Sequence, residues 1–179
     1  MEPIHELLQQ RYSPKEFEDR SVSKETIRAL IEAARWAPSS YNEQPWRFVI
    51  TTKDEPAEFE KLLGCLVPRN QDWAKSAPAL VLSVAKLTLS RNDKPNRHAR
   101  HDVGLAVSQL VLQATALGLC AHQMGGFDAD KARQTFSIPE DFAPVAVIAI
   151  GFSAEAPKDS RSRRPQDEIA FSGKWGEAF

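Results

Sequence analysis

Apolar residues recur along this chain with two periods, and these periods predict helices interleaved with strands. Spacings of three and four residues predict helices over about 3–10, 23–36, 59–66, 99–117 and 128–136. Apolar and β-branched runs predict strands over 46–52, 79–85, 119–124 and 144–152. Strands mixed with helices of unequal length favour an α+β fold, a mixed α/β sandwich, over a regular doubly wound sheet.

Residues that are typical of helix ends define the helix boundaries more closely. Ser23 and Asp128 are typical N-caps, Pro38 ends the second helix, and Gly118 is a typical residue just after a helix. The run 144–152 is almost wholly apolar and does not alternate with polar residues. That continuity is typical of a strand buried on both faces of a sheet.

Two polar segments fall outside the predicted core. Residues 87–100 are charged and contain a proline, so we expect an exposed loop over or beside the functional site. Residues from about 153 to 179 are polar and basic, with Phe171 and Trp175 as isolated large apolar side chains. Because this extension cannot form a core of its own, we expect it to dock on a partner subunit.

Length and composition indicate one domain over 1–179, since 179 residues with 42% hydrophobic residues suffice for one core. A formal net charge of −1 gives no general field for nucleic acid or an anionic membrane. The start lacks the regions of a signal peptide, and no apolar run approaches the roughly 20 residues of a membrane span. We therefore expect a soluble, cytoplasmic protein.

Neither the cysteines nor the histidines indicate a metal. Cys65 and Cys120 stand far apart outside any CxxC pattern, so we expect reduced core residues without zinc or a disulfide. His98, His101 and Asp102 could be imagined as metal ligands, but two histidines at a helix start are more often solvated or capping residues. We expect no metal site, and no Ser-His-Asp order or Gly-x-Gly-x-x-Gly pattern is present.

The segment 37–46 reads Ala-Pro-Ser-Ser-Tyr-Asn-Glu-Gln-Pro-Trp and concentrates hydroxyl and carboxamide side chains between a predicted helix and a predicted strand. Ser and Asn often bond their own backbone in ordinary turns. An ordinary turn would nevertheless leave the Gln-Pro-Trp ending unexplained. Neutral donors and acceptors in such density suit a flat heterocycle with carbonyls and ring nitrogens, such as a flavin.

This segment, Ser-Ser-x-Asn-x-Gln-Pro-Trp after Ala-Pro, resembles the signature of the nitroreductase family of FMN-dependent oxidoreductases. Residues 11–17, Arg-Tyr-Ser-Pro-Lys-Glu-Phe, are similar to that family's first flavin-contacting segment. Residues 151–155 and the later Arg-Arg-Pro at 163–165 resemble its closing strand and phosphate-contacting arginines. The resemblance implies a mostly antiparallel sheet flanked by helices. It also implies a homodimer that exchanges terminal segments and builds two FMN sites at the subunit interface.

The resemblance also implies which residues bind FMN. The phosphate would meet Arg11, Ser13 and Lys15 together with Arg163 and Arg164, whose basic run 161–164 alone would more often be solvated surface. The carboxamides would face the ring and its pyrimidine edge, while the two glycines allow backbone to approach it. The implied cofactor-binding set is Arg11, Tyr12, Ser13, Lys15, Pro38, Ser39, Ser40, Asn42, Gln44, Asn70, Lys75, Met124, Gly125, Gly126, Arg163 and Arg164.

One position departs from the family pattern. Some members carry a Lys several residues after the Asn, placed to offset negative charge on the reduced flavin, whereas Trp73 stands near that position here. Lys15 is the first candidate for that role and Lys75 the second. Tyr41 is a candidate substrate contact, and His122 is either a hydrogen-bonded core residue or another such contact.

The implied function is oxidoreduction carried by the cofactor. NADH or NADPH would pass hydride to flavin N5 and leave, and a nitroaromatic or quinone acceptor would take its place on the same ring face, a ping-pong order. No catalytic side chain is then required. Alternatives remain on the same scaffold, such as reductive dehalogenation, flavin-consuming ring cleavage or another flavin reductase. A non-catalytic FMN-binding or storage protein, or an interaction module without cofactor, also remains open.

Overall fold

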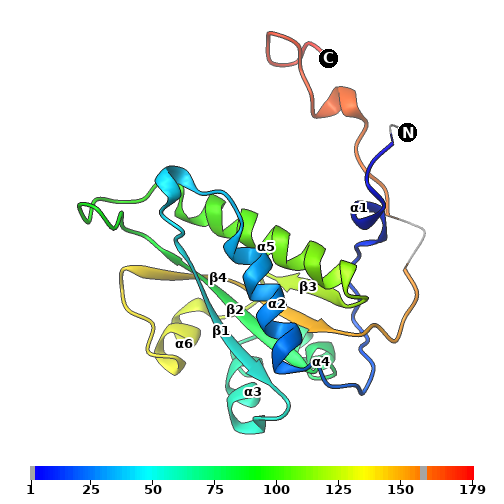
Figure 1. Cartoon of the computed structure of the whole chain (residues 1–179), viewed down its shortest axis with the longest axis vertical. Helices are drawn as coiled ribbons and strands as arrows, with labels where there is room; N and C mark the ends of the chain where they lie inside the picture. Colours follow the sequence, from blue (N-terminus) through cyan, green and yellow to red (C-terminus); the bar gives the residue numbers. More distant parts are fainter. Residues whose placement is uncertain (1–2, 158–160) are drawn as a thin grey trace.

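The computed structural model describes residues 3–157 and 161–179. Its centre is a four-stranded sheet with the order β1-β2-β4-β3 (Figure 1). The strands are β1 (Trp46–Thr52), β2 (Ala79–Lys86), β3 (Cys120–Met124) and β4 (Phe142–Gly151), and each neighbouring pair is antiparallel. The predicted α+β sandwich is confirmed. The expected domain 1–179 and its extension from 153 include residues 1–2 and 158–160, which lie outside the described residues.

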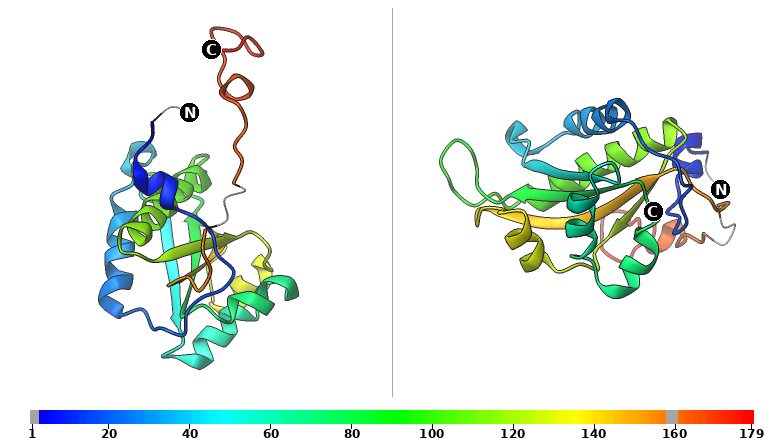
Figure 2. Two further views of the ribbon diagram at one scale, coloured as in Figure 1. Left: turned by 90° about the vertical axis from the view of Figure 1, so that its right-hand side faces the viewer. Right: turned by 90° about the horizontal axis from the view of Figure 1, so that it is seen from below.

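Helices cover both faces of this sheet (Figure 2). On one face lie α2 (Lys24–Arg35) and α5 (Ala99–Ala116). On the other lie α3 (Pro56–Leu63), α4 (Pro68–Ala74) and α6 (Ala129–Thr135). The short α1 (Glu6–Gln10) contacts α5, and two single turns of 3₁₀ helix occur at Ser40–Asn42 and Gln166–Glu168. Among the described residues, no helix combines the length and apolar character needed to cross a membrane.

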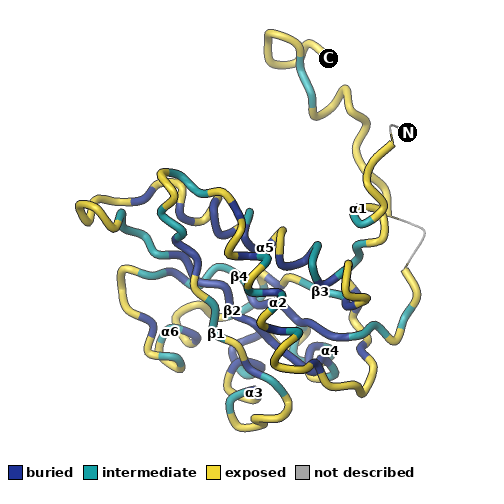
Figure 3. Tube along the Cα trace, in the orientation of Figure 1, coloured by how far each residue is buried: buried dark blue, intermediate teal, exposed yellow. Residues whose placement is uncertain are grey.

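Strand β2 and the second half of β4 are buried (Figure 3), and for β4 the continuous apolar run 144–152 predicts this. In β2, Val81 packs in the cluster beneath α2 and α5, while Leu80 and Leu82 pack in the cluster beneath α3, α4 and α6. Ile148 and Val147 of β4 divide between the same two clusters. The core therefore consists of two apolar layers separated by one sheet.

Capping residues act where the sequence predicts them. Ser23 Oγ accepts a hydrogen bond from Thr26 N at 3.1 Å at the start of α2. Asp128 Oδ1 accepts one from Lys131 N at 2.9 Å at the start of α6. Gly118 follows α5 with φ 74°, a left-handed conformation that glycine adopts without a Cβ penalty.

Two predicted boundaries need correction. Helix α3 ends at Leu63, and a separate helix, α4, starts at Pro68, where proline suits the first helical turn. The sequence did not indicate α4 because Ala74 is its one buried residue among those described, so no apolar period exists. The segment 87–100 is only partly an exposed loop, because Asn96 is buried and α5 begins at Ala99.

The last described residues form an arm that leaves the body of the molecule (Figure 1). We call residues 161–179 the C-terminal arm. Ile169, Trp175 and Phe179 of this arm are 64%, 87% and 94% exposed. Within the arm the rings of Phe171 and Trp175 lie 4.9 Å apart. The arm thus presents apolar side chains that its own chain does not cover.

Close packing at the end of β4 generates a stability prediction. A Cβ at Gly151 would lie 2.5 Å from Pro78 Cδ and 2.9 Å from Phe17 Cδ1. Gly151→Ala should therefore lower the free energy of unfolding toward the upper end of roughly 1–3 kcal/mol. Ser23→Ala, which removes only the cap of α2, should cost about 1 kcal/mol. Urea denaturation of both variants checks this, and equal or smaller loss in Gly151→Ala would contradict the packing described.

Candidate functional site

Most of the polar residues implicated by the sequence form two groups at opposite ends of the sheet, while Asn70 and the turn at Gly125 and Gly126 lie beside β3. Residues 37–45, the signature loop, lead into β1 at Trp46, which pairs with Ala85. The segment 11–18 runs beside the end of β4, where Ile150 pairs with Ala79. Ala79 and Ala85 are six residues apart on β2, so at about 3.3 Å per residue the two ends lie roughly 20 Å apart. Figure 1 shows the signature loop and the N-terminal segment on opposite sides of the molecule.

The signature loop has an unusual backbone. Tyr41, Asn42 and Gln44 have φ values of 54°, 56° and 47°. Non-glycine residues in this left-handed region cost of order 1–3 kcal/mol each, and they persist only where surrounding contacts hold them. Such strain is concentrated at functional sites in proteins.

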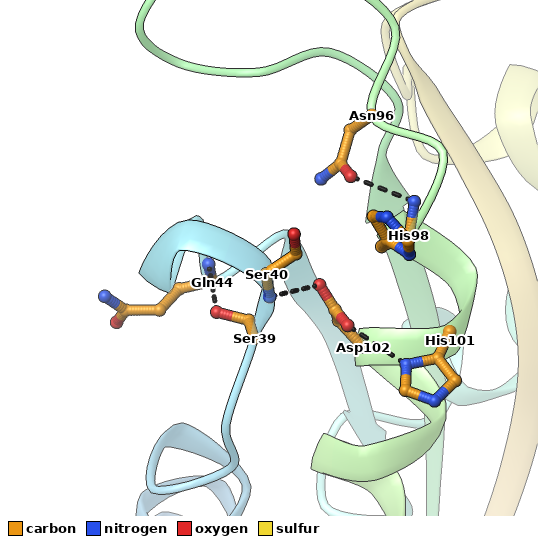
Figure 4. A network of polar contacts seen from close by, with 7 residues as sticks. All are labelled: Ser39, Ser40, Gln44, Asn96, His98, His101 and Asp102. Carbon is orange, nitrogen blue, oxygen red and sulfur yellow. Dashed lines mark hydrogen bonds and ion pairs between the residues drawn. The ribbon is translucent and has the colours of Figure 1, made fainter.

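Hydrogen bonds within and beyond the loop hold this conformation (Figure 4). Ser39 Oγ accepts a bond from Gln44 N at 3.0 Å, and Gln44 Nε2 donates to Asn42 O at 3.2 Å. Ser40 N donates to Asp102 Oδ2 of α5 at 3.0 Å. Ser39 and Gln44 therefore serve the turn itself, while the exposed Asn42 side chain faces outward.

The segment after β2 lies beside the signature loop, as the sequence predicts. Ser90 N donates to Glu43 Oε2 at 2.8 Å. The Arg91 guanidinium lies 4.2 Å from the centre of the Tyr41 ring, a cation–π contact. Tyr41, the candidate substrate contact, is 75% exposed.

The second group surrounds the segment 11–15. The Tyr12 hydroxyl donates to Glu155 O at 2.9 Å, and Lys15 N donates to Glu155 Oε1 at 2.6 Å. These bonds fasten the segment to the residues that follow β4. A hollow of about 170 Å³ opens there, and its lining comprises Tyr12, Ser13, Lys15, Glu155, Ala156 and Arg161.

Arginines from both ends of the chain meet beside this hollow. Burial lowers the pKa of Arg11, and the positive charges of Arg161 and Arg163 lower it further. Arg161 Nη2 donates to Gln9 O at 2.9 Å. We call Arg11, Lys15, Arg161 and Arg163 the basic cluster. Because like charges disfavour one another there, an anion would be stabilised.

The arginines differ from the sequence prediction in one respect. Arg164 pairs with Glu168 at 3.2 Å within the arm, and its side chain is 78% exposed. Arg161, which the family pattern did not indicate, bonds the N-terminal segment instead. Its only signal in the sequence is membership of the basic run 161–164.

Asn70 of α4 meets the turn after β3. Asn70 Nδ2 donates to Gly126 O at 3.0 Å. A Cβ on Gly126 would lie 2.7 Å from that same nitrogen and 3.1 Å from Val67 Cγ2, so glycine is required for this approach. Gly125 is exposed with open space where a Cβ would lie, and Met124 is buried at 3% exposure.

Trp73 and His122 join α4, β3 and the N-terminal segment. Their ring centres lie 4.5 Å apart, and His122 Nδ1 lies 2.8 Å from Pro14 O. A carbonyl only accepts, so Nδ1 carries the proton. Burial lowers the pKa of His122, and the charge of Lys15 lowers it further, which favours the neutral ring. His122 therefore makes the hydrogen bond that the first alternative for it requires, and its contact with a substrate stays a prediction.

The exposed Lys75 follows α4 at its C-cap. At 100° per residue it lies about 140° around the helix from Asn70 and about 160° from Trp73. Asn70 and Trp73, three residues apart, share a face. Lys75 is therefore directed away from the surface where those two side chains meet β3 and its turn.

The histidines, cysteines and carboxylates do not gather into a metal-binding cluster among the described residues. No three His, Cys, Asp or Glu side chains of residues 3–157 and 161–179 gather as metal ligands. His101 Nδ1 lies 3.1 Å from Asp102 Oδ1, a pair without a third partner of this kind. Cys65 and Cys120 are free thiols, and burial raises the pKa of each.

Comparisons with known proteins address the resemblance directly. The model of the nitroreductase family matches residues 8–152. A Methanothermobacter thermautotrophicus protein, provisionally named NADH dehydrogenase/NAD(P)H nitroreductase, is 29% identical, covering 86% of this chain and 79% of that one.

Two solved structures extend the likeness to the fold. An oxidoreductase described as containing FMN superposes with TM-score 0.91 and 32% identity, covering 98% of this chain and 94% of that one. A provisionally named nitroreductase from Desulfovibrio desulfuricans, solved in complex with FMN, gives TM-score 0.78 and 28% identity, covering 95% and 96%. This chain belongs to the nitroreductase family.

Proposed function

We propose that this protein is an FMN-dependent oxidoreductase that takes electrons from NADH or NADPH and reduces a small nitroaromatic or quinone. We further propose that it works as a homodimer in the cytoplasm. The family and the FMN-bearing relatives support the chemistry. The polar residues at both ends of the sheet support the binding site.

The basic cluster is the observation that carries this proposal. Burial and the charges of Arg161 and Arg163 lower the pKa of Arg11, and Lys15 lines the adjoining hollow. A phosphate dianion would relieve that repulsion through charge-assisted hydrogen bonds. FMN has such a phosphate at one end. Ser13, whose hydroxyl accepts from Arg11 Nη1 at 3.3 Å, would complete the set of donors.

The neutral residues fit a flat ring. Because Gly126 has no side chain, the Asn70 carboxamide can reach the turn after β3. The backbone of Gly125 is accessible to a ligand, because no atom occupies the space where a Cβ would lie. When bound, FMN supplies the acceptor of hydride from NAD(P)H and its donor to the second substrate. The chain's residues would orient the ring and exclude water from it. We assign Lys15 to offset negative charge on the reduced cofactor, because Lys75 is directed to another face of α4.

A complete site needs two subunits under this proposal. The signature loop and the basic cluster lie roughly 20 Å apart in one chain, at opposite ends of β2. In a two-fold dimer the signature loop of one protomer can meet the basic cluster of its partner, which produces two equivalent sites. The exposed apolar side chains of the C-terminal arm supply a surface for such an association.

The spectrum of the purified protein tests the cofactor. We expect a yellow protein whose flavin absorbance bleaches on addition of NADH or NADPH without oxygen and returns with a nitrofuran or quinone. A halophenol that restores the colour preferentially would favour dehalogenation. Bound flavin that never bleaches would favour a storage role, and a colourless protein that takes up no FMN would contradict the proposal.

A double substitution tests the phosphate site. Arg11→Ala with Lys15→Ala should weaken FMN binding by at least 100-fold, because each charged partner contributes roughly 1.5–3 kcal/mol. The control is Lys24→Ala with Arg28→Ala, which removes the same charge from the exposed side of α2. Fluorescence titration of the apoprotein measures both affinities. Equal affinities in the two variants would place the phosphate elsewhere.

Removal of apolar side chains tests the arm. Trp175→Ser with Phe179→Ser should shift the protein toward monomer at low micromolar concentration, since both side chains are exposed in one chain and would be buried in the dimer. Sedimentation velocity over a dilution series measures this. A dimer of unchanged strength would show that these side chains do not contribute to the interface.

A further inference from the structure

The strained signature loop is attached to the body of the protein at a buried point. Its internal bonds, such as that from Gln44 N to Ser39 Oγ, close the turn without fixing its place. The bond from Ser90 N to Glu43 reaches another exposed loop. The bond from Ser40 N to Asp102 reaches α5, which packs in the core.

Asp102 is a carboxylate in a position where charge is normally costly. The residue is 2% exposed and lies in the first turn of α5, 62 residues along the chain from Ser40. The start of a helix stabilises negative charge. Oδ2 accepts from Ser40 N at 3.0 Å and Oδ1 lies 3.1 Å from His101 Nδ1 (Figure 4).

The pairing constrains both partners. A buried carboxylate that loses its donors is strongly unfavourable, so Asp102 favours the loop conformation that presents the Ser40 N–H. The neighbouring Tyr41 and Asn42 then adopt their left-handed backbone with one end of the turn fixed.

We propose that Asp102 is a positioning residue for the cofactor site. It fixes Ser40, and thereby the turn that carries Tyr41 and Asn42, in the conformation that receives the ligand. Asp102 does not itself touch the ligand, because its side chain is buried. Without this anchor the turn would relax, and FMN binding would have to order it again. The ligand in this inference rests on the proposed function, whereas the anchoring of the loop does not.

Two substitutions at Asp102 distinguish the loss of the hydrogen-bond acceptor from the loss of the negative charge. Asp102→Ala removes the acceptor, whereas Asp102→Asn retains an oxygen of the same shape without the ionised group. Amide hydrogen exchange of Ser40, followed by NMR, reports the anchor, and fluorescence titration of the apoprotein reports FMN affinity. Ser23→Ala is the control, since it removes a helix cap at the far end of α2 and lowers stability away from the loop.

We expect Asp102→Ala to speed exchange at Ser40 and to weaken FMN binding, each by at least tenfold, which for affinity is about 1.4 kcal/mol. Asp102→Asn should stay within about threefold of wild type in both measurements, and Ser23→Ala should change neither by more than that.

Other outcomes overturn the proposal. Unchanged exchange at Ser40 in Asp102→Ala would show that the carboxylate does not anchor the loop. Faster exchange with unchanged FMN affinity would show that the anchor does not serve the site. If Asp102→Ala does not fold, loss of both properties in the folded Asp102→Asn would refute the hydrogen-bond mechanism. If wild type binds no FMN, the proposed function fails, and exchange at Ser40 alone decides the anchoring.

Discussion

The length of one β-strand determines how this protein can bind a ligand. Strand β2 separates the signature loop from the basic cluster by roughly 20 Å, and both lie on rigid ends of one antiparallel sheet. The apolar core on both faces of β2 and β4 prevents the sheet from bending to bring them together. Under the proposed function a single protomer therefore presents two partial sites, which a dimer would bring together.

Each partial site has a physical feature that a ligand or partner would satisfy. At one end, Arg11 lies partly buried near two further guanidinium groups, which disfavour its charge. At the other end, left-handed backbone at Tyr41 and Asn42 is held against α5 through Asp102. Repulsion and strain of this kind reduce stability. Both the charge repulsion and the left-handed backbone occur at residues that match the family signature. This is consistent with a site whose local stability is lower because binding requires these groups.

The sequence predicted the elements better than their arrangement. Strands β2 and β4 were evident because their apolar runs are continuous, and Ser23 and Asp128 identified two helix starts by side-chain chemistry. The sequence does not predict helix α4, because this helix buries little apolar surface and so has no apolar period. The distance between the two partial sites could not be predicted, since it depends on strand register, which a single sequence does not reveal.

The polar contacts between distant parts of the chain could not be predicted from the sequence either. Beside His98 and His101, Asp102 suggests at most a metal ligand from the sequence, whereas in the structure it accepts from a backbone N–H 62 residues away. The resemblance indicates Arg163 and Arg164, whereas in the structure Arg161 bonds the N-terminal segment. Such roles depend on which segments the fold brings together, so side-chain type and spacing cannot assign them.

Complementation between two defective subunits tests the two-subunit site most directly. One variant would carry Arg11→Ala with Lys15→Ala, and the other Asn42→Trp to block the exposed side of the signature loop. Co-refolded in equal amounts, random pairing would place one intact site in each mixed dimer and restore FMN binding to about a quarter of all sites. Binding in the mixture no greater than the average of the two separate variants would contradict a site shared between subunits.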